Sequence, residues 1–317
     1  MNKRCLICGL TLRNGESLYH VKCMKKLFNS AKVPTLNYTQ EELNELAKSI
    51  IMERISVPGV QPKLSLHLGK GHTENNSRLT LGGLEGDYIL KPQTTQWPFL
   101  PEAEHFAMLF ARLCKIDTAE FGLIPLRSSE FAFITRRMDR TKSEALHMED
   151  FCQLTNKLTS QKYQGSMEQI GKALRKYSSK PGLDAVRLLE LTVFCFLIGN
   201  SDMHLKNFSL IRTAKGSYEL TPAYDLVPVK IILPADNEEL ALPLCGKKSN
   251  LKYRDFAHFA EILDLTRAQF EKTLKKIKRQ SEDKLEEALA RCFMPLEMRE
   301  SLRKLFQVRL TRLLDIG

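Results

Sequence analysis

The residues best suited to chemistry lie in the middle of the chain, in the segment Phe196–Phe208 and just beyond it. Asp202 and Asn207 stand in a D-x4-N spacing, and Asp225 follows after what reads as a short hairpin. At such a spacing one carboxylate can orient a substrate hydroxyl, while an amide and a second carboxylate hold Mg²⁺ on nucleotide phosphates. The spacing therefore indicates phosphoryl transfer.

Further residues stand upstream in the order that such a site requires. The loop Val57–Lys63 contains a glycine, so its backbone N–H groups can approach phosphates. Its candidate nucleotide contacts are Gly59, Val60, Gln61 and Lys63. Lys91 ends an expected strand and is placed to pair with phosphates, and Glu104 in the next expected helix is placed to hold that lysine in an ion pair.

Each of these features also has an ordinary structural explanation. A single glycine does not make a G-x-G-x-x-G loop, and Lys91 alone would suit a solvated strand end. Glu104 would suit the first turn of a helix, where the helix dipole favours an acid, and Asp225 would suit a cap. It is the joint order of the residues along the chain that supports phosphoryl transfer.

The expected elements place these residues in a mixed strand and helix pattern. Apolar spacing predicts helices from Thr39, over 101–113, over 186–198 and after Thr266, the last with a break near Pro295. Alternation and turn signals predict strands after the loop at 56–63, over 87–91, in 123–138 and around Lys215-Gly216. The pattern predicts a bilobal α+β fold, and the order of the candidate residues along it indicates the protein-kinase type. Its expected parts are a basic module at 1–34, a strand-rich N-lobe at 35–140 and a helical C-lobe at 141–317.

Composition limits the class of protein. The chain has 317 residues, of which 43% are hydrophobic and 27% charged, as expected for a soluble protein that buries a core. No apolar run is long enough to cross a bilayer, and the first residues lack the features of a secretion signal, so we expect a cytoplasmic location. The net charge is +11, and residues 1–40 hold seven Lys/Arg against one acid. That basic surface would suit nucleic acid, an acidic protein partner or plain solvent.

Cysteine and histidine cluster near the start of the chain. Cys5, Cys8, His20 and Cys23 stand in two close pairs, the spacing of a small zinc ribbon or knuckle. A Zn²⁺ ion there would be structural and would take no part in catalysis. The alternative is a simple hairpin and helix whose thiols pack on the neighbouring lobe. The other five cysteines are scattered singly, which indicates reduced thiols and not a disulfide framework.

The motifs resemble those of one known family, the HipA-type serine/threonine kinases of bacterial toxin–antitoxin systems. The resemblance covers residues from about 50 to 230, and the matching stretches are Ser56–Lys63, Tyr88–Lys91, Glu104–Ala111, Met138–Arg140, Glu149–Gln153, Leu197–Ser209 and Leu220–Leu226. It implies ATP and Mg²⁺ as cofactors, with Asp202 as the catalytic residue, Asn207 and Asp225 as Mg²⁺ ligands and Lys91 on the nucleotide phosphates.

The resemblance also implies regulation at Ser56, where members of the family phosphorylate themselves and so become silent. A phosphate beside the loop would compete with the phosphates of ATP, which agrees with that role. It further implies a loop-shaping role at the nucleotide site for His204 and a charge-neutralising role in catalysis for Lys206. Arg136 stands where these kinases carry an acid, so adenine contacts should depend on backbone groups.

The short stretch before the Ser56 loop resembles the HipT-like branch of the family. Full-length HipA proteins carry a further subdomain before this loop, and in the HipT-like branch that subdomain is a separate small protein that acts as antitoxin. The resemblance therefore implies a HipS-like antitoxin, a HipB-like DNA-binding antitoxin that provides the only link to DNA, and an essential translation protein, such as an aminoacyl-tRNA synthetase, as the target. Two other functions share the same residues: a small-molecule kinase, and a zinc-bearing scaffold that uses a kinase-like fold only to bind partners.

Overall fold

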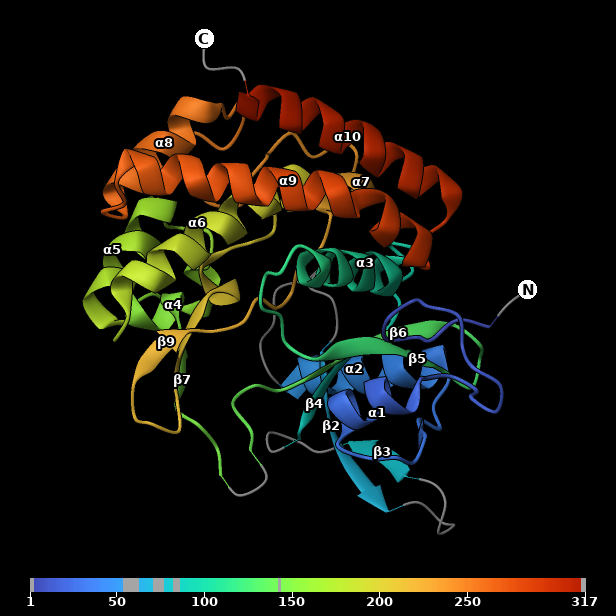
Figure 1. The fold of residues 1–317 in the computed structure, drawn as a ribbon. Coiled ribbons are helices and arrows are strands. Elements are labelled where there is room, and N and C mark those ends of the chain that lie inside the picture. Colours follow the sequence, from blue (N-terminus) through green and yellow to red (C-terminus); the bar gives the residue numbers. More distant parts are fainter. Residues whose placement is uncertain (1–2, 54–62, 71–76, 82–85, 142–143, 315–317) are drawn as a thin grey trace. The chain divides into compact units, whose positions relative to one another are not determined.

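The computed structural model describes residues 3–53, 63–70, 77–81, 86–141 and 144–314 (Figure 1). The chain forms two units. The first comprises Met1–Phe106, Ala119–Arg137 and Ala290–Met294, and the second comprises Ala107–Thr118, Met138–Leu289 and Pro295–Gly317. The first is rich in strands and the second in helices, so the structure has the mixed α+β composition that the sequence predicts.

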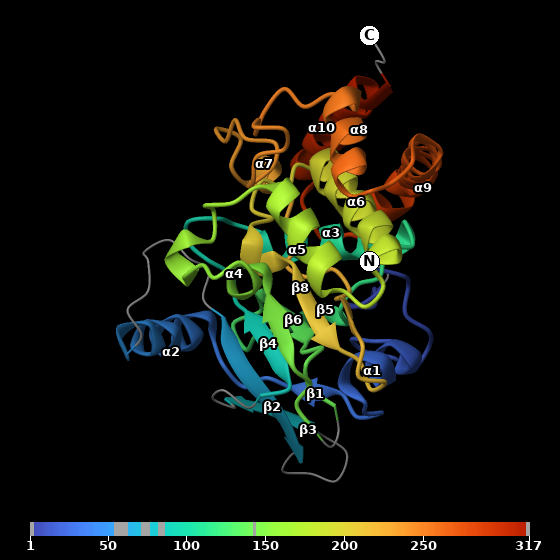
Figure 2. The same cartoon turned by 90° about the vertical axis from the view of Figure 1, so that its left-hand side faces the viewer.

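A six-stranded sheet forms the centre of the first unit (Figure 2). Its strands are β1 (Pro34–Thr35), β2 (Leu64–Lys70), β3 (Ser77–Leu81), β4 (Tyr88–Lys91), β5 (Phe121–Pro125) and β6 (Phe131–Arg136). They lie in the order β1-β3-β2-β4-β6-β5, and all neighbours are antiparallel except β1 and β3. The unit also contains α1 (Val21–Phe28), α2 (Gln40–Glu53) and the first half of α3 (Leu100–Leu113).

Alternation of buried and half-buried residues explains this sheet. In β2 the side chains of Leu64 and Leu66 are buried, and in β4 those of Tyr88 and Leu90 are buried, as the period of two in a strand requires. Strand β3 was not expected, because its segment follows a run of turn-forming residues. It pairs with β2 along its whole length, and its Leu79 is fully buried.

The second unit combines a small sheet with helices (Figure 1). Its three-stranded sheet has the order β7-β8-β9, made of β7 (Met148–Asp150), β8 (Ser209–Arg212) and β9 (Tyr218–Leu220). The helices are α4 (Phe151–Leu154), α5 (Met167–Tyr177), α6 (Pro181–Ile198), α7 (Val229–Ile232), α8 (Tyr253–Ile262), α9 (Arg267–Arg291, whose last two residues belong to the first unit) and α10 (Leu296–Leu314). Two short 3-10 turns are η2 (Thr159–Gln161) and η3 (Leu205–Asn207).

Helix α6 forms the core of the second unit. Every residue from Leu188 to Ile198 is buried, and the helix packs against α5, α8 and α10. It begins at Pro181, five residues before the predicted start, because proline fits the first position of a helix. Its last turn is held by Arg309 of α10, whose guanidinium donates a hydrogen bond to the Phe196 carbonyl. Burial lowers the pKa of Arg309 to about 10, which still leaves it a cation at neutral pH.

The end of α6 depends on glycine. Gly199 has a φ of +79°, in the left-handed region, and its N–H bonds back to the Cys195 and Phe196 carbonyls. A Cβ at this position would lie 2.7 Å from Cδ2 of Leu305. Glycine therefore stops the helix at this point and turns the chain toward Asp202.

Most expected elements are confirmed, including the strand that ends at Lys91, the helix over 101–113, the strand pair around the Arg127–Glu130 turn and the hairpin around Gly216. The break near Pro295 is also confirmed, since α9 ends at Arg291 and α10 begins at Leu296. Among the helices of the described ranges, none combines the length and the apolar character that crossing a membrane requires.

Candidate active site

The loop that carries Asp202 is anchored by the buried side chain of Asn200. The Asn200 N–H donates to the Cys195 carbonyl over 2.9 Å, which continues the end of α6. Its side-chain oxygen accepts a hydrogen bond from the Asp202 N–H at 3.2 Å, and the residue is fully buried. A buried amide that is bonded in this way fixes the backbone of the loop.

Asp202 and Asn207 lie together because the chain makes a tight turn between them. The N–H of His204 and the side-chain Nδ2 of Asn207 both donate to the Asp202 carbonyl, over 2.9 Å and 3.0 Å. Asn207 closes the 3-10 turn η3 and is buried. Because its amide nitrogen is used in the loop, its amide oxygen is the atom that can ligate a cation.

A tyrosine completes this cluster. The Tyr163 hydroxyl donates to Oδ1 of Asp202 over 2.5 Å, and its ring meets the His204 ring edge-on with 5.0 Å between centroids. The segment is tied to the loop by a bond from the Leu205 N–H to the Lys162 carbonyl at 3.1 Å. Burial raises the pKa of the Tyr163 hydroxyl, and the negative charge of Asp202 raises this pKa further, so Tyr163 acts as a donor at neutral pH.

Sequence reasoning missed Tyr163. It follows η2 at a position with no recognisable motif and lies 39 residues before its partner. The local signal is Gly165, two residues on, where a Cβ would lie 3.0 Å from Leu205 in the loop that carries Asp202. That close approach is visible only in the fold.

The hairpin β8–β9 brings Asp225 back toward this cluster. Asp184 in the first turn of α6 accepts the Leu220 N–H over 2.9 Å, and Arg187 donates to the Leu220 carbonyl over 2.6 Å. The chain then reaches Asp225, which has a φ of +58°. The hydroxyl of Tyr224, directly before Asp225, donates to the Lys206 carbonyl over 2.9 Å, so the end of the hairpin is bonded to the loop that carries Asp202 and Asn207.

Lys206 and His204 belong to the same loop as Asp202 and Asn207. Lys206 Nζ lies 2.5 Å from Oδ2 of Asp150, which also caps α4 by accepting the Gln153 N–H. The structure thus places a carboxylate beside the Lys206 cation. The hydroxyl of Tyr224 donates to the Lys206 carbonyl over 2.9 Å. His204 is buried, which suits the loop-shaping role expected for it.

Lys91 and Glu104 form an ion pair in the first unit, as the sequence predicts. Lys91 Nζ lies 2.5 Å from Oε1 of Glu104, and the two residues are only 3% and 0% exposed. The ammonium also lies 5.6 Å from the centre of the Phe133 ring, opposite Lys91 in strand β6. Because the site is buried, removing either partner would leave the other charge poorly solvated and would destabilise the unit.

The remaining candidate residues lie in the first unit or outside the described part of the chain. Ser56, Gly59, Val60 and Gln61 lie outside the described residues, and Lys63 is an exposed residue directly before β2. Arg136 ends β6, and its Nη1 donates to Oδ1 of Asn29 over 2.9 Å, where α1 ends.

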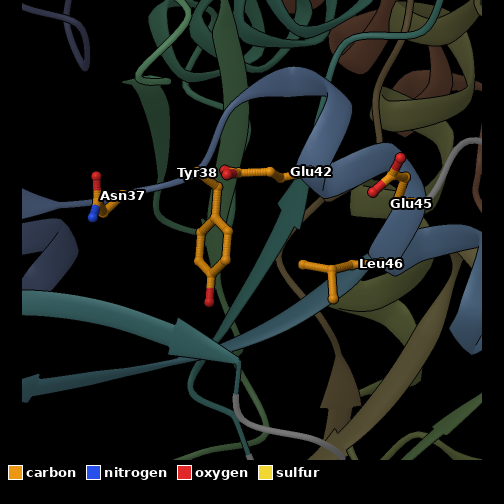
Figure 3. A pocket seen from close by; sticks show the side chains of 5 residues that line it. All are labelled: Asn37, Tyr38, Glu42, Glu45 and Leu46. Atoms are coloured by element: carbon orange, nitrogen blue, oxygen red, sulfur yellow. The ribbon is translucent and has the colours of Figure 1, made fainter.

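One hollow of the first unit lies beside α2 (Figure 3). It is lined by Asn37, Tyr38, Glu42, Glu45 and Leu46. Its lining includes two acids, one of them paired with Arg127, and neither lysine nor arginine, so this hollow is a poor candidate for the nucleotide site.

The second unit therefore contains a set of oxygen donors suited to a hard cation. Asn207 offers an amide oxygen and Asp225 a carboxylate, the ligand types that Mg²⁺ takes from proteins. Asp202 keeps a second carboxylate oxygen beside the one bonded to Tyr163. A carboxylate held in this way can orient a hydroxyl and accept its proton.

Comparison with known proteins defines the class. The structure of HipA from Shewanella oneidensis, solved with HipB and operator DNA, matches with a TM-score of 0.67 over 82% of this chain and 65% of that one, at 23% identity. The fold is therefore of the HipA kinase type. A Haemophilus influenzae protein named as a candidate kinase is 28% identical over 98% of this chain and 97% of its own length.

The family follows from the sequence match. The model of the HipA-like C-terminal domain matches residues 55–285, and the chain belongs to this family. The serine/threonine-protein kinase toxin HipA of Shewanella oneidensis is 27% identical over 56% of this chain. The match spans 43% of the length of that toxin.

The buried ion pair gives a first prediction. In Glu104→Gln the Lys91 ammonium loses its carboxylate, and we expect the free energy of unfolding to fall by about 3 kcal/mol. Urea unfolding followed by circular dichroism measures this loss. Adding Lys91→Met to Glu104→Gln should recover part of it, since the buried charge is then gone.

Glu102→Gln provides a matched control. Glu102 lies on the same helix and is also buried, but the polar side chain that contacts it is the neutral Gln93. This control should lose less than about 1 kcal/mol. Equal losses for the two variants would show that the ion pair does not stabilise the unit.

Proposed function

We propose that this protein is an ATP-dependent serine/threonine protein kinase that acts as the toxin of a toxin–antitoxin system. The observations that carry the proposal are the bond from Asn207 Nδ2 to the Asp202 carbonyl and the bond from the hydroxyl of Tyr224, directly before Asp225, to the Lys206 carbonyl of the same loop. These contacts gather one proton acceptor and two cation ligands in a single unit. That is the set of groups that phosphoryl transfer to a hydroxyl requires.

In this proposal each residue has a defined role in phosphoryl transfer. Asp202 orients the substrate hydroxyl and accepts its proton, and Asn207 and Asp225 hold Mg²⁺. The Mg²⁺ ion, when bound, offsets the charge of the ATP phosphates. Lys91, kept in place by Glu104, pairs with those phosphates. The other residues that we assign to the nucleotide or to catalysis are Gly59, Val60, Gln61, Lys63, Arg136, His204 and Lys206.

Ser56 is the proposed site of self-phosphorylation. It directly precedes the loop assigned to the ATP phosphates. A phosphoserine there would bring a charge close to −2 to the place where ATP must bind, and would silence the enzyme.

We base the proposed partners on the family. The HipA structure from Shewanella oneidensis contains HipB and operator DNA. We propose that this chain pairs with a HipB-like antitoxin, through which alone it reaches DNA, and with a small HipS-like antitoxin. Its target would be a translation protein, with an aminoacyl-tRNA synthetase as the first candidate, and it would act in the cytoplasm, where ATP and that target are found.

The proposal makes a second prediction. After incubation of the purified chain with Mg·ATP, mass spectrometry should find phosphate on Ser56. In Asp202→Asn the amide cannot accept the hydroxyl proton, and we expect phosphorylation to slow by at least about 100-fold. Ser56→Ala should carry no phosphate at this position and should stay active on the protein target.

The decisive negative result combines two measurements. If Ser56 carries no phosphate and Mg·ATP does not raise the melting temperature of the wild-type chain, the kinase proposal is wrong. Phosphate on Ser56 at the same rate in Asp202→Asn would instead remove Asp202 from the mechanism.

Tyr163 gives a third prediction. In Tyr163→Phe the carboxylate of Asp202 loses its hydroxyl donor while the ring against His204 remains. We expect kcat to fall about tenfold, the equivalent of one hydrogen bond to a charged group, with little change in KM for ATP. Initial-rate kinetics with varied ATP separates these two constants.

Tyr177→Phe is the matched control. Tyr177 ends α5 and is about as exposed as Tyr163, at 40% against 44%, but its hydroxyl takes no part in the contacts of Asp202 and Asn207 described above, so the variant should keep wild-type kinetics. If Tyr163→Phe also keeps wild-type kinetics, the hydrogen bond to Asp202 does not orient the catalytic carboxylate.

A further inference from the structure

The four metal-ligand candidates of the N-terminal segment meet at one point. The sulfur atoms of Cys5, Cys8 and Cys23 and a ring nitrogen of His20 all lie within 4.8 Å of one another. They come from two places: the turn that contains Cys5 and Cys8, and the start of α1, where His20 is the N-cap and Cys23 lies in the first turn.

The distances suit a shared ion. Around a tetrahedral Zn²⁺, with bonds of about 2.3 Å to sulfur and about 2.0 Å to nitrogen, neighbouring ligand atoms are roughly 3.6 Å apart. His20 Nδ1 lies 3.2 Å from the Cys8 sulfur and 3.9 Å from the Cys23 sulfur. Thiols that merely packed on an apolar surface would have no reason to converge on one imidazole nitrogen.

The surroundings orient the ligands. His20 Nε2 lies 3.0 Å from the Thr11 carbonyl, to which it donates, so Nδ1 is the nitrogen that keeps its lone pair for a metal. The Cys5 sulfur accepts a hydrogen bond from the His20 N–H at 3.4 Å. Gly9, directly after Cys8, has a φ of +70°, and a Cβ there would lie 2.1 Å from the Arg291 carbonyl oxygen.

The turn that holds Cys5 and Cys8 also covers the edge of the six-stranded sheet. Strand β5 ends the strand order, and the Leu123 N–H of this edge donates to the Leu6 carbonyl over 2.8 Å. The Tyr19 hydroxyl donates to the Leu123 carbonyl over 2.9 Å, and the His105 ring bonds the Ile7 carbonyl over 3.0 Å. The backbone between two of the metal-ligand candidates is thus bonded to the sheet at Leu6 and to helix α3 at Ile7.

We propose that Cys5, Cys8, His20 and Cys23 bind one structural Zn²⁺ ion, which fixes the N-terminal segment on the β5 edge. Three thiolates and one imidazole complete a tetrahedron and leave no open position for substrate or water, so the ion has no catalytic part. Two basic residues of the segment also hold it in place on the first unit. Arg4 donates to the Ala290 and Cys292 carbonyls, and Lys26 pairs with Glu120 at 2.9 Å. The site stands independently of the proposed kinase activity.

The test uses the full chain, purified under reducing conditions. Mass spectrometry of metals should find zinc equimolar with protein. Replacement by Co²⁺ should give the visible bands of a tetrahedral ion and the near-ultraviolet band of thiolate ligation. Cys8→Ser should lose most of the zinc, whereas Cys245→Ser, at a half-buried thiol of the second unit, should keep it.

A second readout does not require a variant to fold. Removing the metal from the wild-type chain with a chelator should speed hydrogen exchange at the Leu123 amide, because its partner turn is released. Zinc far below equimolar with no cobalt bands, equal zinc in Cys8→Ser and wild type, or a disulfide between two of the cluster cysteines in the reduced preparation would each overturn the proposal.

Discussion

Both carboxylates to which we assign phosphoryl transfer, Asp202 and Asp225, depend on the burial of one helix. At its end, α6 stops at Gly199, and the buried Asn200 sets the backbone of Asp202. At its start, Asp184 and Arg187 hold the backbone at Leu220, from which the chain runs to Asp225. A helix that is apolar on nearly every side can be fixed in the core in this way, and its two ends then fix two loops. Arg309 completes the arrangement by bonding the last turn.

The first unit is organised around a buried charge and a covered edge. The Lys91 ammonium forms an ion pair with Glu104 and lies over the Phe133 ring. Lys91 ends a strand in the middle of the sheet. At the edge of the same sheet, the N-terminal segment supplies hydrogen-bond partners to β5. An uncovered edge would present unpaired backbone groups to other chains. The phosphate binding that we propose for Lys91 and the protection of the β5 edge thus involve different parts of one sheet.

The sequence predicted those parts whose signal is local. The strand that ends at Lys91, its pairing with Glu104 and the turn between Asp202 and Asn207 follow from spacing along short segments. Tyr163 and Arg309 could not be found in this way, because each acts on a residue far away in the chain. Strand β3 was missed because its pairing with β2, and not its own composition, decides its structure.

The central claim is that the two carboxylates have different roles: Asp202 accepts the proton of the substrate, and Asp225 holds Mg²⁺. Calorimetric titration with ATP, with and without Mg²⁺, and phosphoryl transfer measured on the same preparations test it most directly. Asp202→Asn should bind Mg·ATP as the wild type does and transfer almost no phosphate, whereas Asp225→Asn should lose the Mg²⁺ dependence of binding. Asp225→Asn binding Mg·ATP with wild-type affinity and Mg²⁺ dependence, or Asp202→Asn transferring phosphate at the wild-type rate, would contradict the account.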